Sequence, residues 1–457
     1  MKASTQVRLP ESAPPPRAVI AKTRILIATD NPAATRAVAT ELRALDLDVQ
    51  LCLFDGKKLA ATPVKAPDAV LCHLTDYVER GPEIARALKA HFAPRTLPVI
   101  AALQRPLPNI SDHFDSSLFA PMHPSQIANR VNAMIRLGIM ETEIQRRMQT
   151  LEEDFGQVVA LKDMTPERRF RVLFIGKASP AFMVIVNALQ HKGVEIVAAF
   201  TSFSAFDYLH GDPFDAVVMN ALEQSEPALT ISETMRRNAK LYHVPTLFLV
   251  NPHSFRDQDA AYKRGARDII SIDADPAEIS GRVLELANYH RIHEQLKAEI
   301  MSMVGSEGLD ASATIFNRRF FDAHLPRMIA DTETNGRRLS VIALRPLPHA
   351  VETVDEAFLS SAYVQTGAMI KGLVRMQDVV ARYDDNTFLL AFSDTDAAAG
   401  EIIMKRIQGL VDCAAFDSGA GRSSAFTVSL AHTIVEHRTG DTAARLIQTA
   451  LSELDEA

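Results

Sequence analysis

From residue 24 onward, short apolar runs alternate with stretches in which apolar residues recur every three or four positions. The run at 24–30 (RILIATD), for example, is followed by a helical pattern at 33–45 (AATRAVATELRAL). This alternation is typical of βαβ units and predicts a doubly wound parallel sheet in an α/β fold. In such sheets the residues that follow the strands form the functional edge, so we look for candidate functional residues at these positions.

The apolar runs recur at a fixed offset along the chain. The segments 24–30, 67–73 and 97–103 are matched 147 positions later by 171–177, 214–220 and 244–250. Three matches in one register predict two copies of one flavodoxin-like fold. We therefore divide the chain into a flexible tail (1–22), a first repeat (23–138), a helical linker (139–168), a second repeat (169–290), a second linker (291–308) and a third domain (309–457).

Composition narrows the possible classes of protein. The net charge of −7 gives no electrostatic basis for wrapping nucleic acid. The three cysteines, Cys52, Cys72 and Cys413, form no metal-binding spacing and indicate a reducing compartment. The sequence shows no signal peptide and no apolar run long enough to span a bilayer. We expect a cytoplasmic protein with no membrane span, no metal and no nucleic-acid partner.

The two repeats resemble response-regulator receiver domains. The resemblance implies an acidic pair after the first strand and a phosphoacceptor aspartate after the third, which together hold Mg²⁺ and the phosphoryl group. Of the acidic pair only Asp30 remains in the first copy, and Gly176 and Lys177 replace it in the second. The acceptor positions are His73 and Asn220.

These losses predict that neither receiver takes up phosphate from a small donor. A histidine can carry phosphate on nitrogen, but we interpret His73 as a polar residue at a strand end and Lys177 as a solvated lysine. The receivers would then serve as docking or dimerisation surfaces. Apolar residues spaced by three or four over 137–163 predict a long helix beyond the first receiver. This helix either packs on its own domain or forms a rigid connector or a dimer seam.

The third domain resembles the GGDEF family, the diguanylate cyclases. The resemblance rests on DASATIFNRRFF at 310–321, a core strand at 338–344, a hairpin at 381–392 and a later strand at 426–435. It implies an α+β domain and a receiver–receiver–GGDEF order over the whole chain.

The signature of an active cyclase is lost at this hairpin. Its five positions read Asp384, Asp385, Asn386, Thr387 and Phe388. Two carboxylates replace the glycines that let the backbone approach the nucleotide, and a neutral amide replaces the metal-binding acid. Arg345 also stands in the region that supplies metal ligands from the first strand. We expect a hairpin with a two-residue Asp384–Asp385 turn and no catalytic residue.

An arginine motif precedes the hairpin. Arg375 and Asp378 form the R-x-x-D of the family's inhibitory site, five residues before the signature, and Arg406 stands where the family has a further arginine. The resemblance implies cyclic di-GMP as the ligand, with no cofactor. Guanidinium groups suit guanine and phosphate, and a carboxylate accepts from guanine N–H groups. The alternative is a surface ion pair on a solvent-facing turn.

The sequence thus predicts a non-catalytic cyclic di-GMP receptor that acts on protein partners. The same layout occurs in a non-catalytic family member with a cell-cycle role, which implies an adaptor for regulated proteolysis, a polar location and a possible homodimer. The alternatives are a residual diguanylate cyclase and a scaffold that binds no nucleotide.

Overall fold

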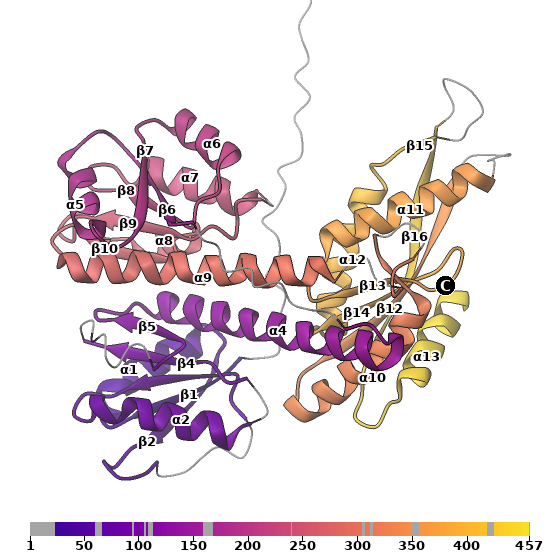
Figure 1. Cartoon of the computed structure of the whole chain (residues 1–457), viewed down its shortest axis with the longest axis horizontal. Helices are drawn as coiled ribbons and strands as arrows, with labels where there is room; N and C mark the ends of the chain where they lie inside the picture. The colour runs from indigo at the N-terminus through magenta and orange to yellow at the C-terminus, as the bar shows by residue number, and fades with distance from the viewer. Residues whose placement is uncertain are drawn as a thin grey trace, which may run out of the picture.

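A computed structural model describes residues 23–456 apart from 60–65, 94–95, 105–106, 108–112, 159–167, 239, 304–306, 311–313, 350–355 and 418–424. It contains two receiver-like domains and a third domain with a mixed sheet (Figure 1). The predicted tail at 1–22 and residues 159–167 of the predicted linker at 139–168 lie outside the described residues. The predicted fold classes, flavodoxin-like for both repeats and α+β for the third domain, are confirmed.

The first receiver, receiver 1, has five parallel strands in the order β2-β1-β3-β4-β5. Its inner strands are almost wholly apolar and buried, as a parallel sheet covered on both faces requires. The elements are β1 (Arg24–Thr29), α1 (Pro32–Ala44), β2 (Asp48–Leu53), β3 (Ala69–His73), η1 (Val78–Arg80), α2 (Gly81–His91), β4 (Val99–Leu103), β5 (Ser116–Phe119) and α4 (Pro124–Phe155).

The second receiver, receiver 2, repeats this topology, with the strand order β10-β9-β8-β6-β7. Strands β3 and β8, and likewise β4 and β9, are separated by the 147 positions found in the sequence. The elements are β6 (Phe170–Ile175), α5 (Pro180–Leu189), β7 (Val194–Ala199), α6 (Ser202–Gly211), β8 (Ala216–Asn220), α7 (Glu226–Arg237), β9 (Thr246–Val250), α8 (Gln258–Lys263), β10 (Asp268–Ser271) and α9 (Pro276–Ser302).

The third domain has a six-stranded, mostly antiparallel sheet in the order β11-β13-β14-β12-β16-β15. Its long central strand pairs with β14 and with β16. The elements are β11 (Phe316–Asn317), α10 (Arg318–Asn335), β12 (Leu339–His349), α11 (Glu356–Leu373), β13 (Val379–Arg382), β14 (Phe388–Ser393), α12 (Ala397–Val411), β15 (Phe416–Asp417), β16 (Ala425–Glu436) and α13 (Ala443–Glu456).

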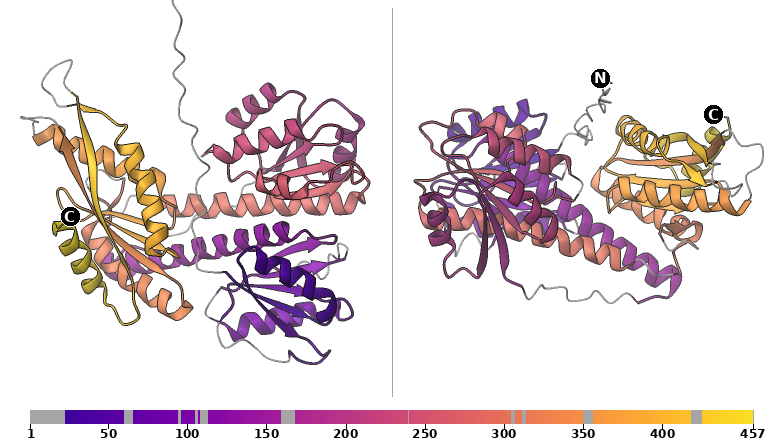
Figure 2. Two further views of the ribbon diagram at one scale, coloured as in Figure 1. Left: turned by 180° about the vertical axis from the view of Figure 1, so that it is seen from behind. Right: turned by 90° about the horizontal axis from the view of Figure 1, so that it is seen from above.

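Two long helices join the receivers to the third domain. Helices α4 and α9 lie side by side and run from the receivers toward the third domain, as Figures 1 and 2 show from three directions. The far end of α4 contacts α10, where Arg327 binds Glu153 and Asp154 at 2.5 and 2.7 Å. The predicted helix over 137–163 is therefore continuous with the last helix of receiver 1, but it ends at Phe155 before Gly156, whose φ is +66°. It acts as a connector within the chain.

The two receivers also contact each other directly. Arg130 on α4 donates to Glu285 on α9 at 2.9 Å, and Glu285 accepts from the Ser116 hydroxyl at 2.6 Å. Arg282 on α9 donates to the Phe119 carbonyl of receiver 1 at 3.0 Å. These polar contacts fix one receiver relative to the other across a mostly buried interface.

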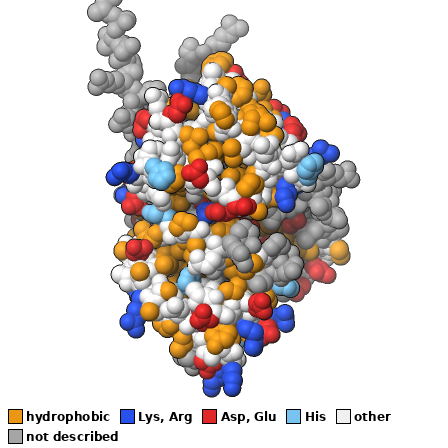
Figure 3. Space-filling model, turned by 90° about the vertical axis from the view of Figure 1, so that its left-hand side faces the viewer, with side chains coloured by type: hydrophobic (Ala, Val, Ile, Leu, Met, Phe, Trp, Pro, Cys, Tyr) orange, Lys and Arg blue, Asp and Glu red, His pale blue; other side chains and the backbone are white. Residues whose placement is uncertain are grey.

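Hydrophobic side chains remain exposed on receiver 2. Hydrophobic side chains gather on the upper half of the face shown in Figure 3. Met183 on α5 is 52% exposed. Phe203 on α6 is 80% exposed. In the part of the chain that the structure describes, no helix is both long and apolar enough to cross a membrane.

Candidate functional site

The arginine motif forms a tight turn between α11 and β13. The Asp378 carboxylate accepts from the Arg375 backbone N–H at 2.9 Å, and the Asp378 N–H donates to the Arg375 carbonyl at 3.1 Å. An aspartate that binds backbone N–H groups of its own turn is a common turn stabiliser. The turn thus fixes Asp378 and directs the chain into β13.

Asp378 is buried, which argues against the alternative of an exposed ion pair on a solvent-facing turn. Its side chain is 1% exposed, and its second carboxylate oxygen has no hydrogen-bond partner among the described residues. Burial raises the pKa of Asp378 to about 6, against the opposing attraction of Arg375. A buried, incompletely satisfied carboxylate is costly to the fold and is a typical mark of a functional position.

Two guanidinium groups adjoin this carboxylate. Arg375 is half-buried and forms no ion pair at hydrogen-bonding distance with any residue that the structure describes. Arg406 on α12 donates to the Leu373 carbonyl. Burial and the charge of Arg375 lower the pKa of Arg406, while Asp378 raises it. The structure therefore brings Arg375, Asp378 and Arg406 together in one place.

Receiver 2 lies next to this group. Burial raises the pKa of Tyr242, and the positive charges of Arg136 and Arg375 act against that rise. Tyr242 also affects the pKa of Arg406, so the loop before β9 lies within electrostatic range of the arginine motif. The site is thus at a junction between domains.

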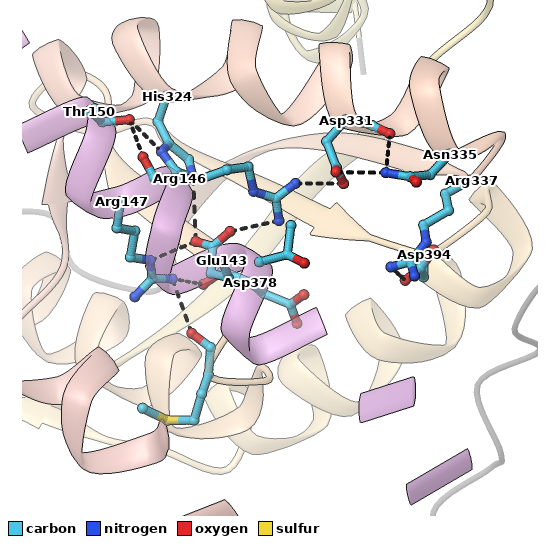
Figure 4. Close-up of polar contacts among 12 residues, drawn as sticks. Glu143, Arg146, Arg147, Thr150, His324, Asp331, Asn335, Arg337, Asp378 and Asp394 are labelled. Atoms are coloured by element: carbon cyan, nitrogen blue, oxygen red, sulfur yellow. Dashed lines mark hydrogen bonds and ion pairs between the residues drawn. The ribbon is translucent and has the colours of Figure 1, made fainter. Parts of the chain in front are cut away.

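Helix α4 of receiver 1 holds the turn from the other side. Arg147 donates to the Met376 carbonyl at 3.0 Å and to Glu143 at 2.6 Å (Figure 4). Glu143 is fully buried, and it also binds Arg146 at 2.8 Å and lies 3.3 Å from His324. Burial opposes ionisation, but Arg147 and His324 hold the pKa of Glu143 well below its usual range. A charged network therefore connects receiver 1 to the arginine motif.

A buried lysine completes the surroundings of Asp378. Lys371 on α11 has no hydrogen-bond partner for its ammonium group among the described residues. Burial and the charge of Arg147 lower the pKa of Lys371 to about 8, while Asp378 and Glu143 oppose that shift. Sequence reasoning missed Arg147, Glu143 and Lys371. Its only signal was a pair of opposite charges, four residues apart, within the apolar stripe of α4.

The signature hairpin forms, but its loop differs from the prediction. The last strand pair is Arg382 with Phe388, so five residues connect the strands instead of two. Asp384 accepts from the Asn386 N–H at 3.0 Å, and Thr387 is buried below the loop. Phe388 is fully buried in the core of the domain, where its role is packing.

The loop carries two exposed carboxylates, from Asp384 and Asp385, and the exposed amide of Asn386. Arg345 lies on β12 at the same edge, because the preceding residue, Leu344, pairs with Phe388. The Arg345 guanidinium binds Asp455 at 2.8 Å. No cluster of three possible metal ligands occurs among the described residues. At this edge of the sheet, Arg345 is therefore paired with Asp455, and the hairpin loop carries two negative charges.

The acceptor position of receiver 1 is buried at the end of β3. His73 lies 3.3 Å from the Thr35 hydroxyl, and burial lowers its pKa despite the charge of Asp30. Asp30 accepts from the backbone N–H groups of Thr75, Asp76 and Tyr77 at 2.8–3.0 Å. Although burial opposes it, these donors hold the pKa of Asp30 below its usual value. The surviving carboxylate organises a loop.

Receiver 2 uses its equivalent positions for structure as well. The Asn220 amide donates to the Ser179 hydroxyl at 3.2 Å and accepts from the Leu222 N–H at 3.2 Å. Gly176 has φ +151°, and a Cβ there would lie 2.4 Å from the Asn220 Cβ. Lys177 is 74% exposed, with Glu223 at 3.7 Å. Lys177 is a solvated strand-end lysine, as expected.

Comparisons with known proteins agree with this architecture. Residues 355–457 match the family model described as diguanylate cyclase, GGDEF domain. Over 409 residues the chain is 22% identical to the response regulator PleD of Caulobacter vibrioides, covering 87% of this chain and 89% of PleD. The two findings support a receiver–GGDEF protein of cyclic di-GMP signalling.

Solved structures match single domains. The GGDEF domain of DgcB from Caulobacter crescentus, solved with cyclic di-GMP, is 17% identical, with a TM-score of 0.27, over 33% of this chain and 86% of that domain. A response regulator from Thermotoga maritima is 21% identical, with a TM-score of 0.24, over 26% of this chain and 98% of that protein.

Proposed function

We propose that the protein is a cyclic di-GMP receptor that does not synthesise this nucleotide. The observation that carries the proposal is the buried carboxylate of Asp378, with one oxygen unsatisfied, beside the guanidinium groups of Arg375 and Arg406. A guanidinium donates to the O6 and N7 atoms of guanine or to a phosphate, and a carboxylate accepts from guanine N1 and N2. The three side chains therefore fit the chemistry of a guanine dinucleotide, and the turn must move to expose the buried Asp378 carboxylate to it.

The hairpin lacks the groups that synthesis of cyclic di-GMP from GTP requires. The loop presents two carboxylates where a triphosphate would approach, and such charges repel each other at short range. Arg345 replaces an oxygen ligand for Mg²⁺ on the neighbouring strand and is held by Asp455. The loss of backbone access and of metal ligands at one edge argues for binding without turnover.

The signal would reach protein partners through the receivers. Arg147 ties the backbone of the Arg375–Asp378 turn to α4, so any ligand that shifts the turn also displaces a helix of receiver 1. The finer resemblance is to PopA, a non-catalytic cell-cycle regulator with the same domain order. On that basis the partners belong to an adaptor system for regulated proteolysis at the cell pole, and the receivers provide the docking surfaces.

Calorimetry on the full-length protein tests the proposal. Cyclic di-GMP should bind, and cyclic di-AMP should not, because adenine lacks the O6 acceptor and the N1 and N2 donors. Absence of cyclic di-GMP binding would favour the nucleotide-independent scaffold. Conversion of GTP to cyclic di-GMP in the same samples would favour the residual cyclase.

A further inference from the structure

A second cluster of arginines lies in a cleft between the receivers. The cleft is narrow and open, with about 420 Å³ of space between its walls when the adjoining solvent is included. Arg130 and Arg136 reach it from α4, His243 and Arg267 from receiver 2, and Tyr289 from α9. Of these residues, none belongs to the Arg375 motif or to the hairpin.

The positive charges of this cleft are not balanced. Arg130 is paired with Glu285, but Arg136 and Arg267 have no carboxylate partner within the described part of the chain. Burial, together with the charges of Arg136 and Arg236, lowers the pKa of Arg267 to about 10. Like charges have thus been brought together at an interface instead of being separated.

Other arginines that lie between elements are treated differently. Arg147 is matched by Glu143 at 2.6 Å, Arg282 by Asp268 at 2.9 Å and Arg291 by Asp215 at 3.1 Å. Folded proteins pair the charges that they bury, because an unpaired charge loses its hydration without compensation. Arg136 and Arg267 are half-buried rather than fully buried, but they lie at an interface and face no carboxylate among the described residues. This arrangement indicates a place that an external anion completes.

The chemistry of the cleft selects the kind of anion. Two arginines from different domains favour a phosphate, which accepts two parallel hydrogen bonds from each guanidinium. Burial, with His293 and Arg136, lowers the pKa of His243 to about 2, so the imidazole stays neutral and adds a flat, uncharged surface. Tyr289 supplies an aromatic ring on the opposite helix.

We propose that the cleft between the receivers binds a phosphate-bearing ligand through Arg136 and Arg267. Such a ligand joins α4 of receiver 1 to receiver 2 and so sets the relative position of the two domains. The proposal does not rest on cyclic di-GMP binding at Arg375. Pyrophosphate, GTP and cyclic di-GMP all carry the required phosphate. Testing them separately shows which kind of phosphate-bearing molecule the cleft binds.

The test is titration calorimetry of the full-length protein with each of these three probes. Arg136→Gln and Arg267→Gln keep the length of the side chain and remove its charge, and Arg36→Gln on the exposed face of α1 is the matched control. Each cleft substitution should weaken the binding of at least one probe about tenfold or more, whereas Arg36→Gln should not. Without ligand, the thermal midpoints of the cleft variants should not fall, because charge repulsion is relieved.

Two results would overturn the proposal. One is that none of the three probes binds, or that all variants bind as the parent does. The other is that Arg375→Ala abolishes the same binding event as Arg136→Gln, because the cleft would then be an extension of the arginine motif. If Arg267→Gln does not fold, Arg136→Gln alone decides, since Arg136 is half-exposed on a helix.

Discussion

Replacing Asp378 by asparagine isolates the cost of burying a carboxylate at the arginine motif. Asparagine keeps an oxygen that can accept from the Arg375 N–H, a contact of 2.9 Å, but it carries no charge. Burial raises the pKa of Asp378 from 3.8 to about 6, with Arg375 opposing the shift. At a pH between these two values, Asp378 therefore still holds its proton in the folded protein, whereas it has released the proton in the unfolded chain.

The sign and size of the effect follow from this difference. Between pH 3.8 and 6 the Asp378 side chain binds less proton in the unfolded state than in the folded state, so its contribution to the free energy of unfolding of the parent decreases as pH rises. At about 1.36 kcal/mol per pKa unit, the penalty reaches about 3 kcal/mol at pH 7. The Asp378→Asn variant lacks this penalty, so it should match the parent near pH 4 and exceed it by about 3 kcal/mol at pH 7.

Urea denaturation from pH 4.5 to 7 measures the effect, below the range in which Lys371 titrates with its pKa of about 8. Asp385→Asn, in the exposed hairpin loop, is the control and should follow the parent at every pH. The reasoning is refuted if Asp378→Asn and the parent show the same dependence of stability on pH. A functional carboxylate that destabilises its own fold would explain why the more stable asparagine does not stand there.

Three further outcomes follow from the structure. Purified protein should form no cyclic di-GMP from GTP with Mg²⁺ or Mn²⁺ in a chromatographic assay, and turnover that Asp384→Ala abolishes would contradict this. Acetyl phosphate or BeF₃⁻ should leave the mass measured by light scattering unchanged, whereas a shift lost in His73→Ala would identify His73 as an acceptor. Arg147→Met should lower the free energy of unfolding by about 3–5 kcal/mol, because it removes a partner of the buried Glu143, and a loss below about 1 kcal/mol would contradict the network.

Much of the fold could be predicted from the sequence, because hydrophobic periodicity is a local property. The pairs β3 and β8, and β4 and β9, were found from a constant offset, and the hairpin was located from the resemblance of residues 381–392 to the family signature. The length of the hairpin loop could not be predicted, since it depends on where strand pairing ends, which is at Arg382 and Phe388. Helix α4 ends at Phe155, before Gly156, although its apolar spacing continued.

The environment of the arginine motif could not be predicted. The spacing of Arg375, Asp378 and Arg406 is visible in the sequence, but the burial of Asp378 depends on α4. Arg147, which contacts the turn, lies 231 positions before Asp378. Without a fold there is no means of knowing that a helix from the first domain covers a turn of the third. The pKa of Asp378 follows from this long-range packing.

The most direct test of binding without turnover is a titration of cyclic di-GMP into three proteins. Arg375→Ala removes a charge-assisted contact of about 2–4 kcal/mol, so it should bind about 30-fold to 1,000-fold more weakly than the parent. Asp384→Gly combined with Asp385→Gly restores the hairpin glycines and should bind as the parent does. If Arg375→Ala instead binds normally and the hairpin variant does not, the ligand lies at the hairpin and the assignment to Arg375, Asp378 and Arg406 is wrong.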